Sequence, residues 1–232
     1  MKKIGFIVFL IALVIGATFA SLVSWGKAAG NFVNFNIDFR SEKGSGNIAT
    51  EVRSITDFTK VEVSSVFQVE ITAQKDFAVE VEADDNLLPH ITTEVRNGRL
   101  EISLDKRVKT SNPMKVRISA PNIERIDASG ASFINLSNLK NSELTVDTSG
   151  ASKINIAGET GKLIVDVSGA SRIDAGNLNA QSANIDAGGA SHVNVNVATD
   201  LMADASGASR ITYSGSPNVS KNTSGAGSVS QK

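Results

Sequence analysis

Asp127-Ala-Ser-Gly-Ala-Ser132 is the first of five near-identical phrases that decide the fold of this chain. The other four begin at Asp147, Asp166, Asp186 and Asp204, and a shortened copy, Ser224-Gly-Ala-Gly227, ends the series. The glycines of these copies follow one another at steps of 20, 19, 20, 18 and 18 residues. A repeat of this length indicates units that bury their apolar sides only by stacking on their neighbours.

Short runs of alternating apolar and polar residues flank each phrase, such as Leu144-Thr-Val146 before one copy and Lys153-Ile-Asn-Ile156 after it. Alternation with a period of two places one set of side chains in a core and the other in solvent, as in a β-strand. We therefore predict an all-β chain, a single-stranded parallel β-helix (solenoid) with coils of about 18–20 residues. One internal column of this solenoid should contain Ile134, Ile154, Ile173, Val193 and Ile211.

The repeated phrase itself predicts a tight corner between two strands. Glycine adopts the backbone angles of a sharp bend, alanine and serine keep the bend thin, and the aspartate can accept bonds from nearby backbone N–H groups. Leucine-rich repeats and calcium-binding nonapeptide repeats are excluded, because neither the Leu-x-x-Leu-x-Leu spacing nor Gly-Gly-x-Gly-x-Asp is present.

The beginning of the chain predicts export. Met1-Lys-Lys3 precedes an uncharged run, Ile4 to Val23, whose length favours an uncleaved membrane anchor over a cleaved signal peptide. Cleavage is the alternative, because Thr18 and Ala20 are small residues at the positions that a signal peptidase reads. Residues 1–25 are thus a signal peptide or a signal-anchor helix. Either interpretation places the rest of the protein in the cell envelope, in the periplasm or at the surface, and residues 4–23 favour membrane attachment.

The remaining chain divides into a linker, residues 26–47, and a β-helix domain, residues 48–232, with regular repeats over residues 126–227. Asn97-Gly98 stands between two alternating runs and predicts a two-residue hairpin. Val61 to Val69 aligns with Ile126 to Ile134, which predicts that the same stack begins near residue 58.

Composition excludes several classes of function. The 232 residues contain no cysteine, which excludes disulfides, thiolate metal sites and a cysteine nucleophile. The formal net charge is −1, and no basic stripe with interleaved aromatic residues is present, so we do not expect nucleic-acid binding.

Columns of identical polar residues are the candidate sites. The aspartates Asp127, Asp147, Asp166, Asp186 and Asp204 should stack one per coil. Such a column could bind a ladder of divalent cations, but we favour solvated corner aspartates that are compensated by a basic column of Lys153, Arg172, His192 and Arg210. A further column, Asn135, Asn155, Asp174 and Asn194, should stabilise the stack through amide hydrogen bonds. We expect neither a bound metal nor a cofactor.

A catalytic set is not evident. Polysaccharide-cleaving enzymes need carboxylates with divided roles and aromatic platforms, whereas these aspartates have equivalent settings and only Phe133 and Tyr213 are aromatic after residue 126. His90 and His192 are far apart and lack partners at metal-ligand spacing, and Asp84-Asp85 indicates a solvated loop. We therefore predict a protein that is not an enzyme.

The strand that ends in Ala120-Pro121, the repeated Ser-Gly-Ala-Ser corners and the terminal Arg210-Ile-Thr-Tyr-Ser-Gly-Ser-Pro217 together resemble the putative auto-transporter adhesin, head GIN domain family. The resemblance covers residues from about 50 to 232 and implies a β-helical domain of a bacterial envelope protein. It implies no catalytic or binding residues.

Three functional hypotheses remain from the sequence. The first is a non-enzymatic, envelope-exposed module for adhesion to a surface protein or glycan. The second is a structural protein that assembles with itself into a homo-oligomer, and the third is an enzyme that acts on polysaccharide.

Overall fold

A computed structural model describes residues 41–232. The predicted signal segment and most of the predicted linker lie outside these residues. Within residues 41–232 the one helical element is the 3-10 helix η2 (Leu88–His90), and no helix there is long and apolar enough to cross a membrane.

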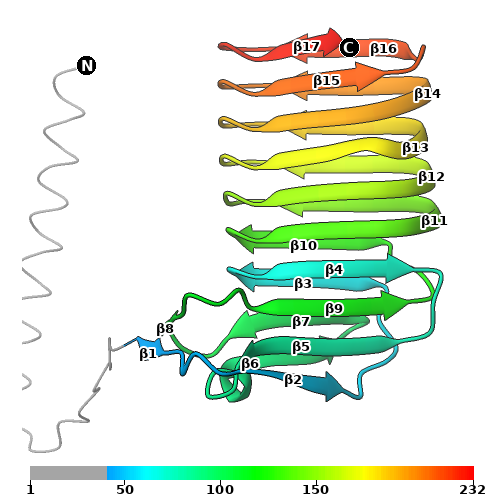
Figure 1. Cartoon of the computed structure of the whole chain (residues 1–232). Coiled ribbons are helices and arrows are strands. Elements are labelled where there is room, and N and C mark those ends of the chain that lie inside the picture. Colours follow the sequence, from blue (N-terminus) through cyan, green and yellow to red (C-terminus); the bar gives the residue numbers. More distant parts are fainter. Residues whose placement is uncertain (1–40) are drawn as a thin grey trace, which may run out of the picture. The chain divides into compact units, whose positions relative to one another are not determined.

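The described chain is an all-β solenoid made of two rows of strands that face each other across a core (Figure 1). The first row contains β6 (Ile91–Arg96), β7 (Arg99–Leu104), β3 (Lys60–Ser65), β10 (Arg125–Gly130), the second halves of β11 (Phe133–Thr148), β12 (Lys153–Val167), β13 (Arg172–Ala187) and β14 (His192–Ala205), and β16 (Asn218–Thr223). The second row contains β2 (Ile48–Arg53), β5 (Ala78–Asp84), β9 (Lys115–Ala120), β4 (Gln68–Ala73), the first halves of β11 to β14, β15 (Arg210–Ser214) and β17 (Ser228–Gln231). A separate pair joins β1 (Glu42–Lys43) to β8 (Val108–Lys109).

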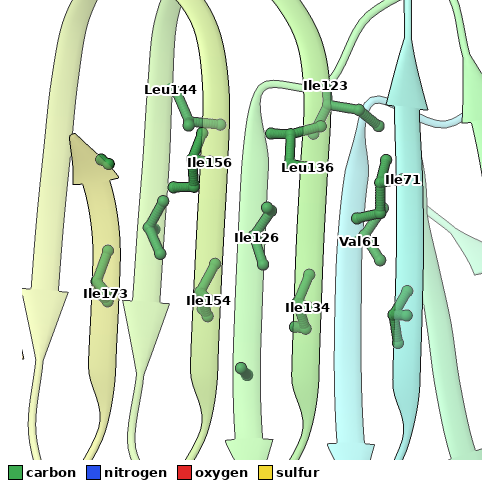
Figure 2. Close-up of a cluster of buried hydrophobic side chains, with 14 of the residues drawn as sticks. Val61, Ile71, Ile123, Ile126, Ile134, Leu136, Leu144, Ile154, Ile156 and Ile173 are labelled. Carbon is green, nitrogen blue, oxygen red and sulfur yellow. The ribbon is translucent and has the colours of Figure 1, made fainter. Parts of the chain in front are cut away.

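The regular coils confirm the predicted parallel solenoid. Strands β11 to β15 pair in parallel, each with the next, and the predicted internal column is in register from coil to coil. Its members are at most 2% exposed: Ile134, Ile154, Ile173, Val193 and Ile211. Figure 2 shows Ile134, Ile154 and Ile173 beside the apolar side chains of the facing row, such as Ile126 and Leu144.

The order of coils in the stack differs from their order in the chain. Val61 pairs with Ile126 and Val69 pairs with Ile134, which confirms that the early stretch stacks directly beneath the repeats. Below it lies a coil that comes later in the sequence, because β7 pairs with β3 and β9 pairs with β4. After β9 the chain returns to the upper side of β3 and starts the regular repeats with β10.

Antiparallel strands close the lower end of the stack. β6 pairs with β7, and β5 and β2 add successively to β9. The turn between β6 and β7 is the predicted hairpin, and both of its central residues have positive φ, 52° at Asn97 and 72° at Gly98. Two positive angles match the type I′ turn that suits the twist of paired strands.

Charged residues occupy core-facing register positions at both ends. On the outermost strand β2, Glu51 and Arg53 pair with the buried Val81 and Val79 and form an ion pair of 3.0 Å with each other. On the outermost strand β16, Lys221 pairs with the buried Ala203. Charges in such positions stop a sheet edge from pairing with another chain, because pairing would bury them.

Each corner stacks on the corner below with almost no space between the two backbones. From the second phrase onward, the alanine N–H donates to the carbonyl oxygen of the glycine one coil below, for example from Ala170 to Gly150 at 2.9 Å and from Ala208 to Gly189 at 2.7 Å; in the first phrase Ala131 donates to Ser65. A Cβ on Gly169 would lie 2.5 Å from the Gly150 oxygen, and one on Gly189 would lie 2.4 Å from the Gly169 oxygen. Glycine is therefore required here by the neighbouring coil as well as by the bend.

The last serine of each phrase fills the inside of the corner. These serines are at most 3% exposed: Ser132, Ser152, Ser171, Ser191 and Ser209. Ser171 donates its hydroxyl to the Gly150 carbonyl at 3.1 Å and accepts the N–H of Ser152 at 3.2 Å, so its buried oxygen is satisfied. Within the described residues the corner N–H groups bond to carbonyls and serine hydroxyls of adjacent coils and not to the aspartates, which corrects the predicted Asx-turns.

The prediction of a solvated Asp84-Asp85 loop is wrong for Asp84. This residue ends β5, is 2% exposed, and accepts hydrogen bonds from Thr110 and from Asn112, the latter at 2.6 Å. These two bonds, together with the backbone N–H of Gly46, hold the pKa of the Asp84 carboxyl below its ordinary value. Asp85 is exposed, as expected.

The glycine corners give a first testable prediction. Gly169→Ala should destabilise the protein by roughly 3 kcal/mol or more, because alanine would have to keep a φ of +92° and also push away the Gly150 carbonyl. Gly98→Ala is the matched control, since Gly98 has a φ of +72° but open space around it, and should cost only about 1 kcal/mol. Chemical denaturation measures the free energy of unfolding of the two variants and of wild type. Equal losses of stability in the two variants would contradict the role of coil stacking.

The buried carboxylate gives a second prediction. Because the folded pKa of Asp84 is lowered, its stabilising effect is complete above the unfolded value of about 3.9 and disappears as pH falls through the folded value. Asp84→Asn should therefore lower the melting temperature at neutral pH, and this difference should shrink below pH ~4. Asp76→Asn, at an exposed position, is the control. A difference from wild type that stays constant down to acidic pH would contradict the assignment.

Candidate interaction faces

The five predicted aspartates form one column on the outward side of the first row of strands. Their register is continuous from β10 to β14, and the members are Asp127, Asp147, Asp166, Asp186 and Asp204. We call these five residues the aspartate column and this side of the slab the acidic face. Three glutamates extend the line downward in register, Glu62, Glu101 and Glu94. Neighbouring coils lie about 4.8 Å apart, so each adjacent pair of charges repels by about 0.9 kcal/mol in water.

Arginines neutralise the lower part of this line. Arg99 bonds Glu62 at 2.9 Å and lies 3.4 Å from Asp127, while Arg125 contacts Asp127 at 2.7 Å and also bonds Asp147. Among the described residues, no cationic side chain lies within 4.0 Å of the upper three aspartates, Asp166, Asp186 and Asp204. Partly exposed pairs of this kind contribute little to stability, so their main effect is to restrict excess negative charge to the upper coils.

The predicted compensation of the aspartates by the basic column is wrong. Lys153, Arg172, His192 and Arg210 are in register with one another, but they lie on the first halves of β12 to β14 and on β15. The corner reverses the chain between an aspartate and the base six residues later, so the two belong to different rows of strands. The ion pairs come instead from Arg125, two positions before Asp127 on β10, and from Arg99 on β7, which lies two strands below Asp127.

The second row therefore has a basic outward side, which we call the basic face. Its basic column is exposed except for the half-buried His192, and the column begins above Phe133, whose ring lies 5.4 Å from the Lys153 ammonium. The solenoid thus carries negative charge on one face and positive charge on the other, although the net charge of the chain is only −1.

The predicted amide ladder lies beside the basic column. Asn155 donates to Asn135 at 2.7 Å, and Asn194 donates to Asp174 at 2.9 Å. The Asn194 amide, the Gly176 N–H and the charges of Lys232 and Lys153 hold the pKa of Asp174 below its ordinary value. This column is therefore a stabilising feature of the stack that also presents hydrogen-bonding groups to solvent.

The aspartate column lacks the geometry of a metal centre. No group of three or more His, Asp or Glu side chains in residues 41–232 could hold a metal ion. Along the column each coil contributes one carboxylate, whereas calcium takes six to eight oxygen ligands. A shallow groove of about 330 Å³ follows the column from Glu62 to Asp166, with Arg125 at its side.

His90 has partners that the sequence did not indicate. Its Nδ1 lies 3.1 Å from Asp105 and its Nε2 lies 3.8 Å from Glu42, which also bonds Lys106 at 2.9 Å. Glu42 is 48 positions away in the sequence, and no spacing rule connects the two. The contact joins β1 to the loop after β7 and is a structural link in the lower end of the solenoid.

The arrangement of strands and columns defines a class of protein, a β-solenoid that displays regular polar faces. The family described as putative auto-transporter adhesin, head GIN domain, matches residues 57–217, and the chain belongs to this family. The resemblance seen in the sequence is thereby confirmed.

Solved structures share the fold. The chain is similar to a putative adhesin from Bacteroides fragilis, with 22% identity and a TM-score of 0.63 over 82% of this chain and 98% of that one. It is also similar to a putative adhesin from Parabacteroides merdae, with 18% identity and a TM-score of 0.53 over 82% and 98% of the two chains. A putative lipid binding protein from Parabacteroides distasonis has 19% identity and a TM-score of 0.52 over 83% and 100%. No curated protein matches the chain.

The face geometry predicts the response to calcium. Melting curves of the full chain in neutral detergent, recorded in millimolar calcium and in chelator, should overlay, because single-file carboxylates do not form calcium sites. If calcium did bind, a free concentration one hundred times the Kd would raise the free energy of unfolding by about 2.7 kcal/mol per site. An upward shift with calcium that disappears in Asp166→Asn with Asp186→Asn would instead establish the cation ladder.

Proposed function

We propose that this protein is a non-enzymatic interaction module of the bacterial cell envelope, which adheres to a surface protein or glycan through its flat polar faces. The observation that carries the proposal is the repetition itself. Each regular coil presents an aspartate at one outward position and a lysine, arginine or histidine at another, so each face offers an extended row of similar contacts. Membership of a family described by adhesin names supports the same function.

Attachment to the membrane is part of the proposal. It is supported by Lys2 and Lys3 followed by the uncharged run from Ile4 to Val23, which suits an export signal that remains as an anchor.

An enzyme is the weaker hypothesis. Glycoside hydrolysis needs two carboxylates with different environments on either side of the substrate. The upper aspartates have equivalent environments, and the hollows over the faces of the described chain are shallow and open. We infer that the carboxylates serve recognition or solubility rather than bond cleavage.

Self-assembly is the structural alternative, and the ends of the stack argue against its simplest form. End-to-end stacking would bury Glu51 and Arg53 at one end and Lys221 at the other, at a cost that an apolar end would avoid. Side-by-side association of the two oppositely charged faces is the form of assembly that this geometry leaves open.

The test uses the full chain in neutral detergent. A glycan and protein array should show saturable binding to a defined ligand, and sedimentation should show the same single-chain species over a wide range of protein concentration. Reversible association that increases with concentration, without binding on the array, would favour the structural alternative. A parallel assay in which polysaccharide is cleaved, and in which cleavage is lost in an Asp166→Asn variant, would favour the enzyme.

A further inference from the structure

The basic face has a cation excess that is restricted to the regular coils. Lys153, Arg172, His192 and Arg210 have no carboxylate within 4.0 Å among the described residues. Lower on the same row, bases do have partners, since Lys115 bonds Glu82 at 2.8 Å and Arg117 contacts both Glu80 and Glu82. Lys153 and Arg172 repel each other at one coil spacing, and Arg210 follows two coils above Arg172, beyond His192. The unpaired column therefore favours an anion that lies along it.

The one outward carboxylate on this face between β11 and β15 of the described chain is Asp174. It lies in the neighbouring amide column, where it accepts hydrogen bonds from Asn194 at 2.9 Å and from the Gly176 N–H at 3.1 Å. Its lone pairs are thus partly occupied within its own column. It does not form an ion pair with Arg172 or Lys153, and the guanidinium and ammonium groups are free to bind another anion.

A shallow hollow runs between the two columns. Arg172, His192 and Arg210 line one side of it, Asp174, Asn194 and Thr212 line the other, and its volume is about 90 Å³. The hollow is too shallow to enclose a compact ligand. It suits one thin extended chain that follows the stack direction. Two guanidinium groups and the His192 imidazole lie on one flank, and the Asp174 carboxylate, the Asn194 amide and the Thr212 hydroxyl lie on the other.

We propose that the basic face binds a linear acidic polysaccharide along this hollow. Successive coils place a basic side chain and a hydrogen-bonding group in the same register, from Lys153 with Asn155 to Arg210 with Thr212. A polymer of repeated sugar units can therefore meet a similar contact at successive coils. Guanidinium groups bind carboxylate or sulfate through paired hydrogen bonds, and the neighbouring amides and hydroxyls can donate to and accept from sugar hydroxyls. Because one polymer makes all of these contacts, each contact after the first forms within the same complex, and the overall affinity exceeds that of a single contact. The inference rests on the proposed adhesive function and specifies its ligand.

Two other occupants are less well matched. Single-stranded nucleic acid binds through several stacked aromatic platforms, but Phe133 is the one aromatic outward residue on these strands of the described chain, and Tyr213 packs against the core. A second copy could place its aspartate column on the basic column, because both repeat once per coil. Both occupants are distinguished by the experiment below.

The experiment measures binding of the full chain in neutral detergent to immobilised polygalacturonate, with dextran as a neutral polymer and poly(dT) as an anionic polymer without acidic sugars. Polygalacturonate should bind best, and its affinity should fall as salt increases. Arg172→Ala with Arg210→Ala should weaken binding at least about tenfold, because two charge-assisted contacts are lost. Lys140→Ala with Lys162→Ala is the matched control, since it removes two exposed charges away from the basic face and should leave affinity nearly unchanged.

Four outcomes would overturn the proposal. Equal weakening in the two double variants would mean that bulk charge alone causes binding, and tighter binding of poly(dT) would assign the face to nucleic acid. Concentration-dependent self-association that is lost in the Arg172 and Arg210 variant would assign it to a second copy. A melting curve of each variant is the control for folding. If an array identifies a different ligand while polygalacturonate does not bind, the adhesive function stands and only this inference fails.

Discussion

The close approach of successive glycine corners is the constraint on which the rest of the structure depends. From the second copy of the phrase onward, a hydrogen bond of 2.7 to 2.9 Å connects the alanine N–H to the glycine carbonyl below it, and no Cβ fits between the two backbones. This contact sets the vertical spacing of the coils at one edge of the slab. Since both rows of strands start or end at that edge, their register follows from it, and so do the columns of side chains inside and outside.

Exact stacking has an electrostatic consequence. A charged residue at one outward position of the repeat becomes a column of like charges, and the aspartates and bases on the two sides of the corner become two columns on different faces. Arg99 and Arg125 neutralise only the lower aspartates. The regular coils therefore retain an excess of negative charge on one face and of positive charge on the other, which a compact fold with mixed surface charges would avoid. Retaining this charge in the regular coils is compatible with binding a charged ligand and makes little contribution to folding.

The repeated part of the fold was predictable because each phrase is a local signal that determines its own register. The internal isoleucine and valine column, the aspartate column and the amide ladder all follow from counting positions relative to the corner glycine. The assignment of charge partners failed because it required knowing that the corner separates two faces. The partners of Asp84 and His90 and the place of β7 and β9 below β3 and β4 could not be predicted. They depend on contacts between segments about 28 to 48 residues apart that carry no repeated pattern.

The unequal lengths of the coils show which parts of the unit are constrained. Every regular glycine lies four residues before its core residue, as Gly169 does before Ile173, and in all five copies it lies three residues after its aspartate. The differences in coil length, from 18 to 20 residues, must therefore lie in another part of the coil. The register shifts between coils do lie at the opposite edge of the slab, for example from Leu136 to Leu139 and from Ala175 to Asn179. Variation in length at that edge moves neither the core nor the two charged columns. The fold thus keeps both faces regular near the glycine edge, where the core and the outward columns share one register, and tolerates irregularity only where neither is affected.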